Sequence, residues 1–276
     1  MPMENLRYLL LLCGLFTSAV VFSQGQKSFY KTYSGGPFDK GEGIVQLPDS
    51  AYAITGMSSS FVEGKSQAFI TKLDSLGNRL WSRSYGGANS DRGRRIFYEQ
   101  GVGFWVAGFS NSTATGDFDY YLFHTNEDGD LIWERRYESE GWDRLWDAIR
   151  LDDGSFLLAG QAQANNGSSS GYLLKTAANG DVLWEQFIES PNDDIIYTIE
   201  NFTDTTFLIA GQQNSPITNL PSAFIRCMDF DGQIVWETFY NSGNDMGAVH
   251  DLSFFGNEIL AAGEILEEGE DDVNHW

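Results

Sequence analysis

The sequence predicts an all-β fold built from about five copies of one four-stranded antiparallel unit, and three repeated columns of residues predict it. Tryptophans in a Gly-x-x-x-Trp pattern recur at spacings of 52, 51 and 52 residues, at Trp81, Trp133, Trp184 and Trp236. Glycines that end an apolar run share this period, at Gly56, Gly108, Gly160, Gly211 and Gly263. Aspartates precede these glycines by 17 or 18 residues, at Asp39, Asp91, Asp143, Asp194 and Asp245. Such a period is typical of solenoids, propellers and arrays.

Each unit begins with two segments of strand character. The first is Glu42 to Gln46 and its equivalents, and the second is an apolar run such as Ser155 to Gly160. In that run Phe156 and Leu158 point one way and equally apolar residues point the other way. A strand buried on both faces needs layers on both sides. No convincing helical period follows the N-terminal region, so we expect those layers to be other sheets.

The third segment carries an aromatic column and runs into a turn that ends in glycine, which supplies the positive φ of a tight hairpin. The fourth segment holds the repeated tryptophan. The aromatic column is Phe69, Tyr121, Tyr172 and Phe224. Four short antiparallel strands per unit, buried on both faces, describe the blade of a β-propeller. The tryptophan then serves to fill an interface between blades.

The two ends of the chain bear on ring closure. Phe29 to Tyr33 lies 52 residues before the Trp81 strand and matches it, with Phe29 in the place of the tryptophan. At the other end, Trp276 falls where the aromatic residue of a third strand falls. Either the N-terminal strand completes a five-bladed ring, which removes open edges, or the sequence is the front part of a longer propeller. We favour the second and expect an incomplete or minimally closed ring.

Residues 1–23 predict a secretory signal peptide. Arg7 precedes an apolar run from Tyr8 to Phe22, and Val21 and Ser23 hold the small-residue positions of a cleavage site. We therefore expect a secreted or cell-surface protein whose propeller covers residues 24–276. Its repeats would span about 28–78, 79–130, 131–181, 182–233 and 234–276, with the last one truncated.

The cysteines and the hydropathy argue against a lipid anchor, a disulfide and a membrane span. Lipid attachment at Cys13 is disfavoured because Leu12 precedes it, where a lipoprotein signal has a small side chain. After cleavage Cys227 is the only cysteine left, so no intramolecular disulfide is expected. No later run of 18 or more apolar residues predicts a membrane span.

The charge excludes some ligand classes. The net charge is −22, with 39 acidic and 17 basic residues, which disfavours nucleic acid because phosphates are neutralised by clustered lysines and arginines. We interpret the aspartate column as turn or cap residues. The alternative is a ring of carboxylates that binds calcium near the channel mouth. No other cofactor and no metal site are predicted.

A resemblance supports this interpretation. Lys72 to Trp81 has the form Lys-x-Asp-x-x-Gly-x-x-x-Trp, and these units resemble secreted bacterial β-propeller repeats over nearly all of Ser28 to Gly263. They are also distantly similar to the tryptophan-docking blades of quinoprotein-type propellers. The first resemblance implies a cargo of type IX secretion, although no sorting domain is visible. The quinoprotein cofactor site is not carried over, because its vicinal cysteine pair is absent.

Departures from the repeat are where we expect function, because a catalytic group is needed once and a blade-building group in every blade. Exposed aromatics beside arginines are typical of binding hot spots and of sugar-stacking platforms. The candidate ligand-binding residues on this basis are Trp142, Arg92, Arg94 and Arg95. We expect Trp105 and Trp146 to pack in the core.

The histidines predict no metal site, and a catalytic base at His250 is the less favoured alternative to a structural role. His250 aligns with Ile44 and its equivalents in the first strands, so we expect a buried histidine that faces a blade interface. His124 stands where Lys72 and Lys175 stand, which predicts a solvated position. No nucleophile motif occurs, and catalytic residues stay unknown. We therefore expect a binding or structural module for an extracellular protein or polysaccharide, and the alternative is a glycan-active hydrolase or lyase.

Overall fold

The computed structural model describes residues 29–33, 35, 38–61, 65–139, 141–163, 167–190, 193–215, 220–240, 246–256, 258–266 and 273–275. Within these ranges the regular secondary structure is β-strand throughout. This confirms the predicted all-β fold. The predicted signal peptide, Asp245 and Trp276 lie outside the described residues. The described ranges contain no helix of the length and apolarity needed to cross a membrane.

Each repeat contributes strands in a fixed order. The first strands are β1 (Asp39–Gln46), β5 (Asp91–Glu99), β9 (Asp143–Arg150), β13 (Ile195–Thr203) and β17 (Met246–Phe255). The second strands are β2 (Tyr52–Ser58), β6 (Gly103–Ser110), β10 (Phe156–Gln163), β14 (Thr206–Asn214) and β18 (Glu258–Leu266). The third strands are β3 (Gln67–Leu73), β7 (Asp119–Thr125), β11 (Ser169–Thr176), β15 (Pro221–Asp229) and β19 (Val273–His275). The fourth strands are β4 (Arg79–Tyr85), β8 (Leu131–Tyr137), β12 (Val182–Ile188) and β16 (Ile234–Tyr240).

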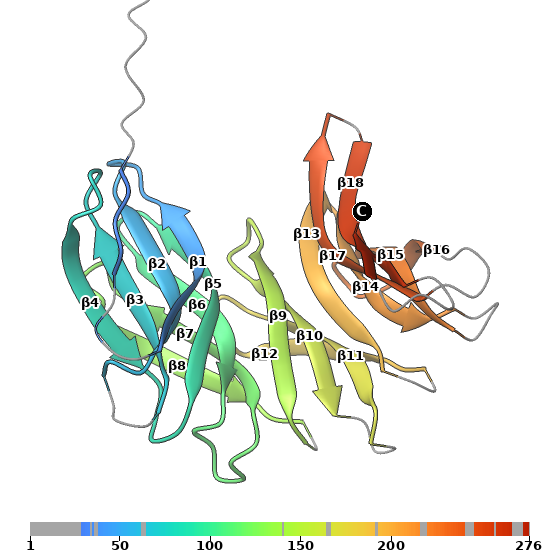
Figure 1. The fold of residues 1–276 in the computed structure, drawn as a ribbon, viewed down its shortest axis with the longest axis horizontal. Coiled ribbons are helices and arrows are strands. Elements are labelled where there is room, and N and C mark those ends of the chain that lie inside the picture. The colour runs from blue at the N-terminus through green and yellow to red at the C-terminus, as the bar shows by residue number, and fades with distance from the viewer. Residues whose placement is uncertain are drawn as a thin grey trace, which may run out of the picture.

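Consecutive strands pair into five antiparallel sheets, four of them four-stranded and the last three-stranded among the described residues. Figure 1 shows the sheets following one another in an arc, and each first strand contacts the first strand of the next sheet. The sheets are therefore propeller blades whose first strands line the inner side. No hydrogen-bonded ladder of the described residues joins the first sheet to the fifth, so hydrogen bonds do not close the ring.

The core lies between the blades. Every residue of β6 is buried, as the apolar runs on both faces predict. One cluster joins Ile70 of the first sheet to Phe104, Tyr121 and Phe123 of the second, and the ring of Tyr85 stacks on that of Phe123 with centroids 4.6 Å apart. Burial of this apolar surface stabilises the contact by about 25 cal/mol per Å².

The repeated tryptophan and the tyrosine four residues after it both contact the hairpin of the next sheet. A Cβ at Gly129 would lie 2.9 Å from Trp81, and the hydroxyl of Tyr85 donates to the carbonyl oxygen of Gly129 at 2.7 Å. The hydroxyl of Tyr137 does the same to Gly180 at 2.8 Å. Gly129 has a φ of +81°, and a side chain there would be both strained and crowded. These contacts explain the 52-residue motif.

The N-terminal segment makes the same contacts without forming a strand. Phe29 packs on Gly77, and the hydroxyl of Tyr33 donates to the carbonyl oxygen of Gly77 at 2.6 Å. Residues 29–33 have no ladder partner, so the expected strand is absent from this part of the described chain. The predicted register is nevertheless correct, because Phe29 occupies the place that Trp81 occupies one repeat later.

Candidate functional site

Every first strand contains a β-bulge at the same place. At this place the ladder between first and second strand skips one residue, which is Glu42, Arg94, Trp146, Tyr197 or His250. The fourth sheet has a second irregularity further along, between Asn201 and Thr203. A bulge leaves its extra residue unpaired and re-aims the side chain, and bulges are frequent beside functional sites. The five bulge residues differ in every blade, whereas the backbone feature that carries them is repeated.

The glycine column exists because of the bulges. Each glycine lies directly opposite the bulge, where a Cβ would overlap a backbone carbonyl oxygen of the first strand. At Gly108 that oxygen belongs to Arg92, and at Gly211 it belongs to Ile195. A carbonyl in a ladder cannot withdraw as a flexible side chain can. The glycine column, which is visible in the sequence, therefore gives the positions of five bulges that have no sequence signal of their own.

The bulge residues contact one another from blade to blade. The carboxylate of Glu42 pairs with Nη1 of Arg94 at 2.9 Å, and the guanidinium carbon of Arg94 lies 4.6 Å from the ring centroid of Trp146. The rings of Trp146 and Tyr197 meet edge to face at 5.5 Å, and those of Tyr197 and His250 lie 4.5 Å apart. We call these five residues the bulge arc. It spans the inner strands of five blades.

The two ends of the bulge arc differ in charge. At β1 and β5, Glu42 accepts from three cations: Lys40 at 2.9 Å, Arg94 at 2.9 Å, and Arg92. Burial alone would raise the pKa of Glu42, but the hydrogen bonds from Lys40 and Arg92 outweigh it, and the pKa is lowered. At β17, Nε2 of His250 lies 3.2 Å from the carboxylate of Glu264.

A second row of polar groups follows the bulge arc by one residue. Arg95 pairs with Asp147, whose other oxygen accepts from the hydroxyl of Thr198 at 3.2 Å and from a backbone N–H of β13 at 3.1 Å. Burial raises the pKa of Glu200, and the charges of Asp147 and Asp251 act in the same direction. The hydrogen bond from Asp147 raises the pKa of Arg95, and the charges of Asp251 and Glu200 act in the same direction, so carboxylates of three blades stabilise this one cation.

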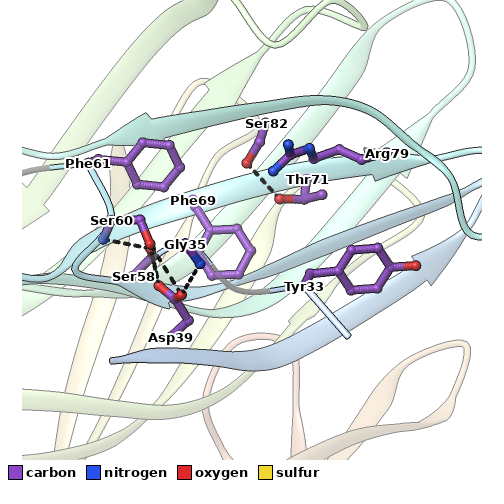
Figure 2. A pocket seen from close by; sticks show the side chains of 10 residues that line it. All are labelled: Tyr33, Gly35, Asp39, Ser58, Ser60, Phe61, Phe69, Thr71, Arg79 and Ser82. Atoms are coloured by element: carbon purple, nitrogen blue, oxygen red, sulfur yellow. Dashed lines mark hydrogen bonds between the residues drawn. The ribbon is translucent and has the colours of Figure 1, made fainter. Parts of the chain in front are cut away.

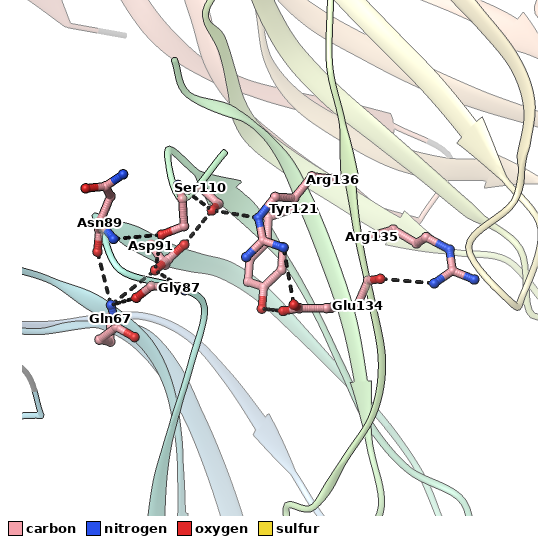
Figure 3. Close-up of polar contacts among 10 residues, drawn as sticks. Gln67, Gly87, Asn89, Asp91, Ser110, Tyr121, Glu134, Arg135 and Arg136 are labelled. Atoms are coloured by element: carbon pink, nitrogen blue, oxygen red, sulfur yellow. Dashed lines mark hydrogen bonds and ion pairs between the residues drawn. The ribbon is translucent and has the colours of Figure 1, made fainter. Parts of the chain in front are cut away.

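The aspartate column lies outside the bulge arc, at the loops between blades. Figure 3 shows Asp91 accepting from the backbone N–H of Gly87 at 2.9 Å and from Gln67 at 3.2 Å, beside a chain of contacts that continues to Arg136. Asp39 and Asp143 likewise accept the N–H of the residue four positions earlier, at 2.9 and 3.0 Å. These carboxylates hold the loop that leads from one blade to the next.

A cavity of about 130 Å³ lies on the first sheet (Figure 2). Its lining includes Phe69, Thr71, Ser82, Asp39 and Tyr33. The ladder equivalents of Phe69 and Thr71 in the second sheet face the first sheet. The cavity thus belongs to an inter-blade face and not to the bulge arc.

The structure places the four predicted ligand-binding residues in different surroundings. Arg94 belongs to the bulge arc, Arg92 pairs with Glu42, and Arg95 pairs with Asp147. Trp142 lies half-buried before β9, where the guanidinium of Arg144 is 5.3 Å from its ring. The guanidinium of Arg94 lies over two aromatic rings, and the nearer is that of Trp146, which the sequence had assigned to the core; the other is that of Phe109, at 5.8 Å. Trp146 is half-buried, whereas Trp105 is buried as expected.

The expectation for His250 is wrong. The residue at the ladder position of Ile44 is Leu252, which is 3% exposed, whereas the side chain of His250 is 42% exposed at the bulge. In the fifth repeat Val249, which pairs with Gly263, comes four residues after Asp245. In the fourth repeat Ile196, which pairs with Gly211, comes only two residues after Asp194. Counting from the aspartate therefore misplaced the histidine by two residues.

The expectation for His124 is also wrong. This residue is buried, and its ring stacks on that of Trp105 with centroids 4.2 Å apart and planes 3° apart. Burial, and next the charge of Arg150, lower its pKa. Lys72 and Lys175 at the same column have long stems that reach the next aromatic, and an imidazole cannot. The described residues contain no group of three or more His, Cys, Asp or Glu placed to hold a metal ion.

Comparisons with known proteins give distant likenesses. No protein-family model and no curated protein matches the chain. The WD40 domain of Pan2 from Neurospora crassa is similar with a TM-score of 0.45 and 13% identity, over 82% of this chain and 61% of that one. A eukaryotic initiation factor gives 0.42 and 12%, over 82% and 52%. The endo-arabinase from Bacteroides thetaiotaomicron gives 0.40 and 11%, over 86% and 91%. The chain thus spans less than two thirds of the first two.

Proposed function

We propose that this chain is an exported propeller that binds a polysaccharide outside the cell through the bulge arc. The observation that carries the proposal is the continuous contact of Arg94, Trp146 and Tyr197, which come from three successive blades and lie on the inner strands. Trp146 and Tyr197 are half-buried, so neither residue is enclosed in the core. Export rests on the N-terminal residues 1–23 alone.

The chemistry of the bulge arc suits a sugar. Aromatic faces pack against the C–H groups of sugar rings, and adjacent guanidinium, phenol and carboxylate groups hydrogen-bond hydroxyls. Binding sites commonly combine such apolar surface with a few fixed polar groups. The residues also vary from blade to blade, as expected for a surface that recognises one ligand in one orientation.

A glycan array tests the proposal with wild type, Trp146→Ala and Trp142→Ala. We expect the wild type to bind at least one glycan and Trp146→Ala to lose about tenfold or more in affinity, since a stacked ring contributes about 1 kcal/mol or more. Trp142→Ala removes the aromatic residue that the sequence predicted to bind ligand, which lies outside the bulge arc, and this variant should bind like wild type if the bulge arc is the site. A Trp146→Ala variant that folds and binds like wild type contradicts the proposal. Binding of a protein and of no glycan also contradicts it, because the partner would then be a protein.

A second candidate is a glycan-active hydrolase or lyase, and Glu200 favours it. A carboxyl whose pKa is raised by burial and by neighbouring carboxylates is suited to donate a proton to a leaving group. Turnover of a bound glycan by wild type, with loss of turnover but not of binding in Glu200→Gln, would establish the enzyme. Binding without turnover in wild type would exclude the enzyme and support the binding module.

A further inference from the structure

We infer that the ligand of the bulge arc is an acidic polysaccharide, whose sugar carboxylate binds at the end formed by Lys40, Arg92 and Arg94. The inference rests on the proposed function, because it names the class of glycan that the same surface takes.

The distribution of charge along the inner strands supports an anionic ligand. The chain carries a net charge of −22, yet its cations concentrate on the first strands of the first three blades. Six of the 17 lysines and arginines lie on β1, β5 and β9: Lys40, Arg92, Arg94, Arg95, Arg144 and Arg150. The first strands of the last two blades, β13 and β17, carry none. The strands β1, β5 and β9 carry as many acidic residues, namely Asp39, Glu42, Asp91, Glu99, Asp143 and Asp147. Their formal charge is therefore zero, against −22 for the chain. A polyanion is thus repelled less by these inner strands than by the rest of the molecule, and its attraction is limited to the cations around Glu42.

The contacts around Glu42 leave cations in excess. Three cationic side chains face one carboxylate, and the side chain of Glu42 is 8% exposed. Burial and the charge of Arg92 lower the pKa of Arg94, so the two guanidiniums repel each other. Nε of Arg92 is buried and has no hydrogen-bond partner in the described part of the chain, so part of its charge is uncompensated. A second carboxylate would relieve this repulsion and accept charge-assisted hydrogen bonds.

One cation of the group is open to a ligand. The side chain of Lys40 is 55% exposed, whereas those of Arg92 and Arg94 are 19% and 14% exposed. Arg94 also contacts Trp146, so a carboxylate held by Lys40 and the arginines would place its sugar ring near that indole.

The opposite end of the bulge arc is acidic, and this difference in charge orients the ligand along the arc. His250 faces Glu264 there, and the neighbouring positions carry Glu200 and Asp251 with no lysine or arginine on either first strand. An acidic sugar is therefore favoured at the β1 and β5 end, aromatic stacking occurs in the middle, and hydroxyl groups meet acceptors at the β17 end.

Calorimetric titration with oligogalacturonate, oligomannuronate and oligoglucuronate tests the inference, each beside its own methyl ester, which keeps the sugar and removes the charge. We expect wild type to bind at least one oligouronate about tenfold more tightly than its ester, and more weakly at higher salt. Lys40→Gln should lose most of that preference. Lys65→Gln removes an exposed lysine outside the bulge arc and should bind within about twofold of wild type.

The outcomes separate the two proposals. Equal or tighter binding of the esters, with binding still lost in Trp146→Ala, overturns the acidic-ligand inference and leaves polysaccharide binding intact. Equal losses in Lys40→Gln and Lys65→Gln also overturn it, because the effect would then follow overall charge. Failure of wild type to bind any oligosaccharide, charged or esterified, overturns the proposed function itself.

Discussion

The outer hairpins and the inner bulges are both repeated in this molecule, but they carry different residues. On the outer strands the same pair recurs: Trp81 and Tyr85 contact Gly129 just as Trp133 and Tyr137 contact Gly180. On the inner strands one backbone feature recurs with a different side chain in each blade. An outer position thus does the same task in the first two blades, and the third keeps Trp184 although Ile188 replaces the tyrosine, whereas an inner position differs in every blade.

The difference shows where a repeat protein can acquire specificity. A side chain that fills the contact between blades is constrained by its neighbour, and substitution there costs stability. The residue of a bulge is unpaired and aimed away from the ladder, so its identity is limited less by the fold. The glycine opposite each bulge maintains the geometry while the bulge residue changes.

The largest expected effect comes from breaking a bulge. Gly108→Ala puts a Cβ against the carbonyl oxygen of Arg92, and β6 is buried along its whole length. We expect the free energy of unfolding to fall by about 3 kcal/mol. Gly101→Ala is the control, since its Cβ meets open space and only the φ of +78° is unfavourable, for a loss of about 1 kcal/mol. Equal losses in denaturant titrations would contradict the role assigned to the glycine column.

A pair of tryptophans separates the two regions directly. Trp133→Ala removes packing on Gly180, and we expect a loss of about 2 kcal/mol in unfolding free energy with ligand affinity unchanged. Trp146→Ala should do the reverse, with a loss below about 1 kcal/mol and weaker binding. Chemical denaturation and binding of both variants provide the measurement. Parallel effects on both properties would remove the distinction between outer and inner positions.

A departure from the repeat at the blade loops predicts pH dependence. Asp119 holds the ladder position of Gln67, which donates to the aspartate of the next blade. Burial, and next the charge of Asp143, raise the pKa of Asp119 to about 7, and burial raises that of Asp143 to about 6. Both values lie above those of the unfolded chain, about 4, so their stabilising effect is present at low pH and is lost as the pH rises through about 6 to 7.

Asp119→Gln should therefore give the interface between the second and third blades the contact that Gln67 and Asp91 make between the first and second. We expect it to raise the unfolding free energy at about pH 8 by about 1 kcal/mol and to flatten the fall in stability between about pH 5 and 8. Thermal melts across this range give the measurement. A wild-type protein that is more stable at pH 8 than at pH 5 would count against the raised pKa values.

A similarly small effect is expected for one hydrogen bond of the outer region. Tyr137→Phe removes the hydroxyl that donates to Gly180 at 2.8 Å, at a cost of about 1 kcal/mol. Tyr30→Phe is the control, because Tyr30 is 93% exposed and should show no change. If the two variants melt alike, the tyrosine hydroxyl does not contribute to the contact between blades.

Local, repeated signals were sufficient to predict the blades. The period, the apolar runs and the hairpin glycines each act within a few residues, so the strands and the place of Phe29 follow from them. The site depends on register, which a count along the chain does not give. His250 aligned with Ile44 by its distance from Asp245, yet the ladder puts Leu252 there. Trp146 looked like a core residue because nothing local marks a bulge.

The sequence by itself determined the unit, its four strands and the residues that join one unit to the next, because these depend on spacing and hydrophobic pattern. The tertiary structure decided which variable residues meet. Glu42, Arg94, Trp146, Tyr197 and His250 lie about one repeat apart in the chain and come into contact only because five bulged strands pack side by side. Such contacts depend on packing between sheets, and no single repeat contains the information for them.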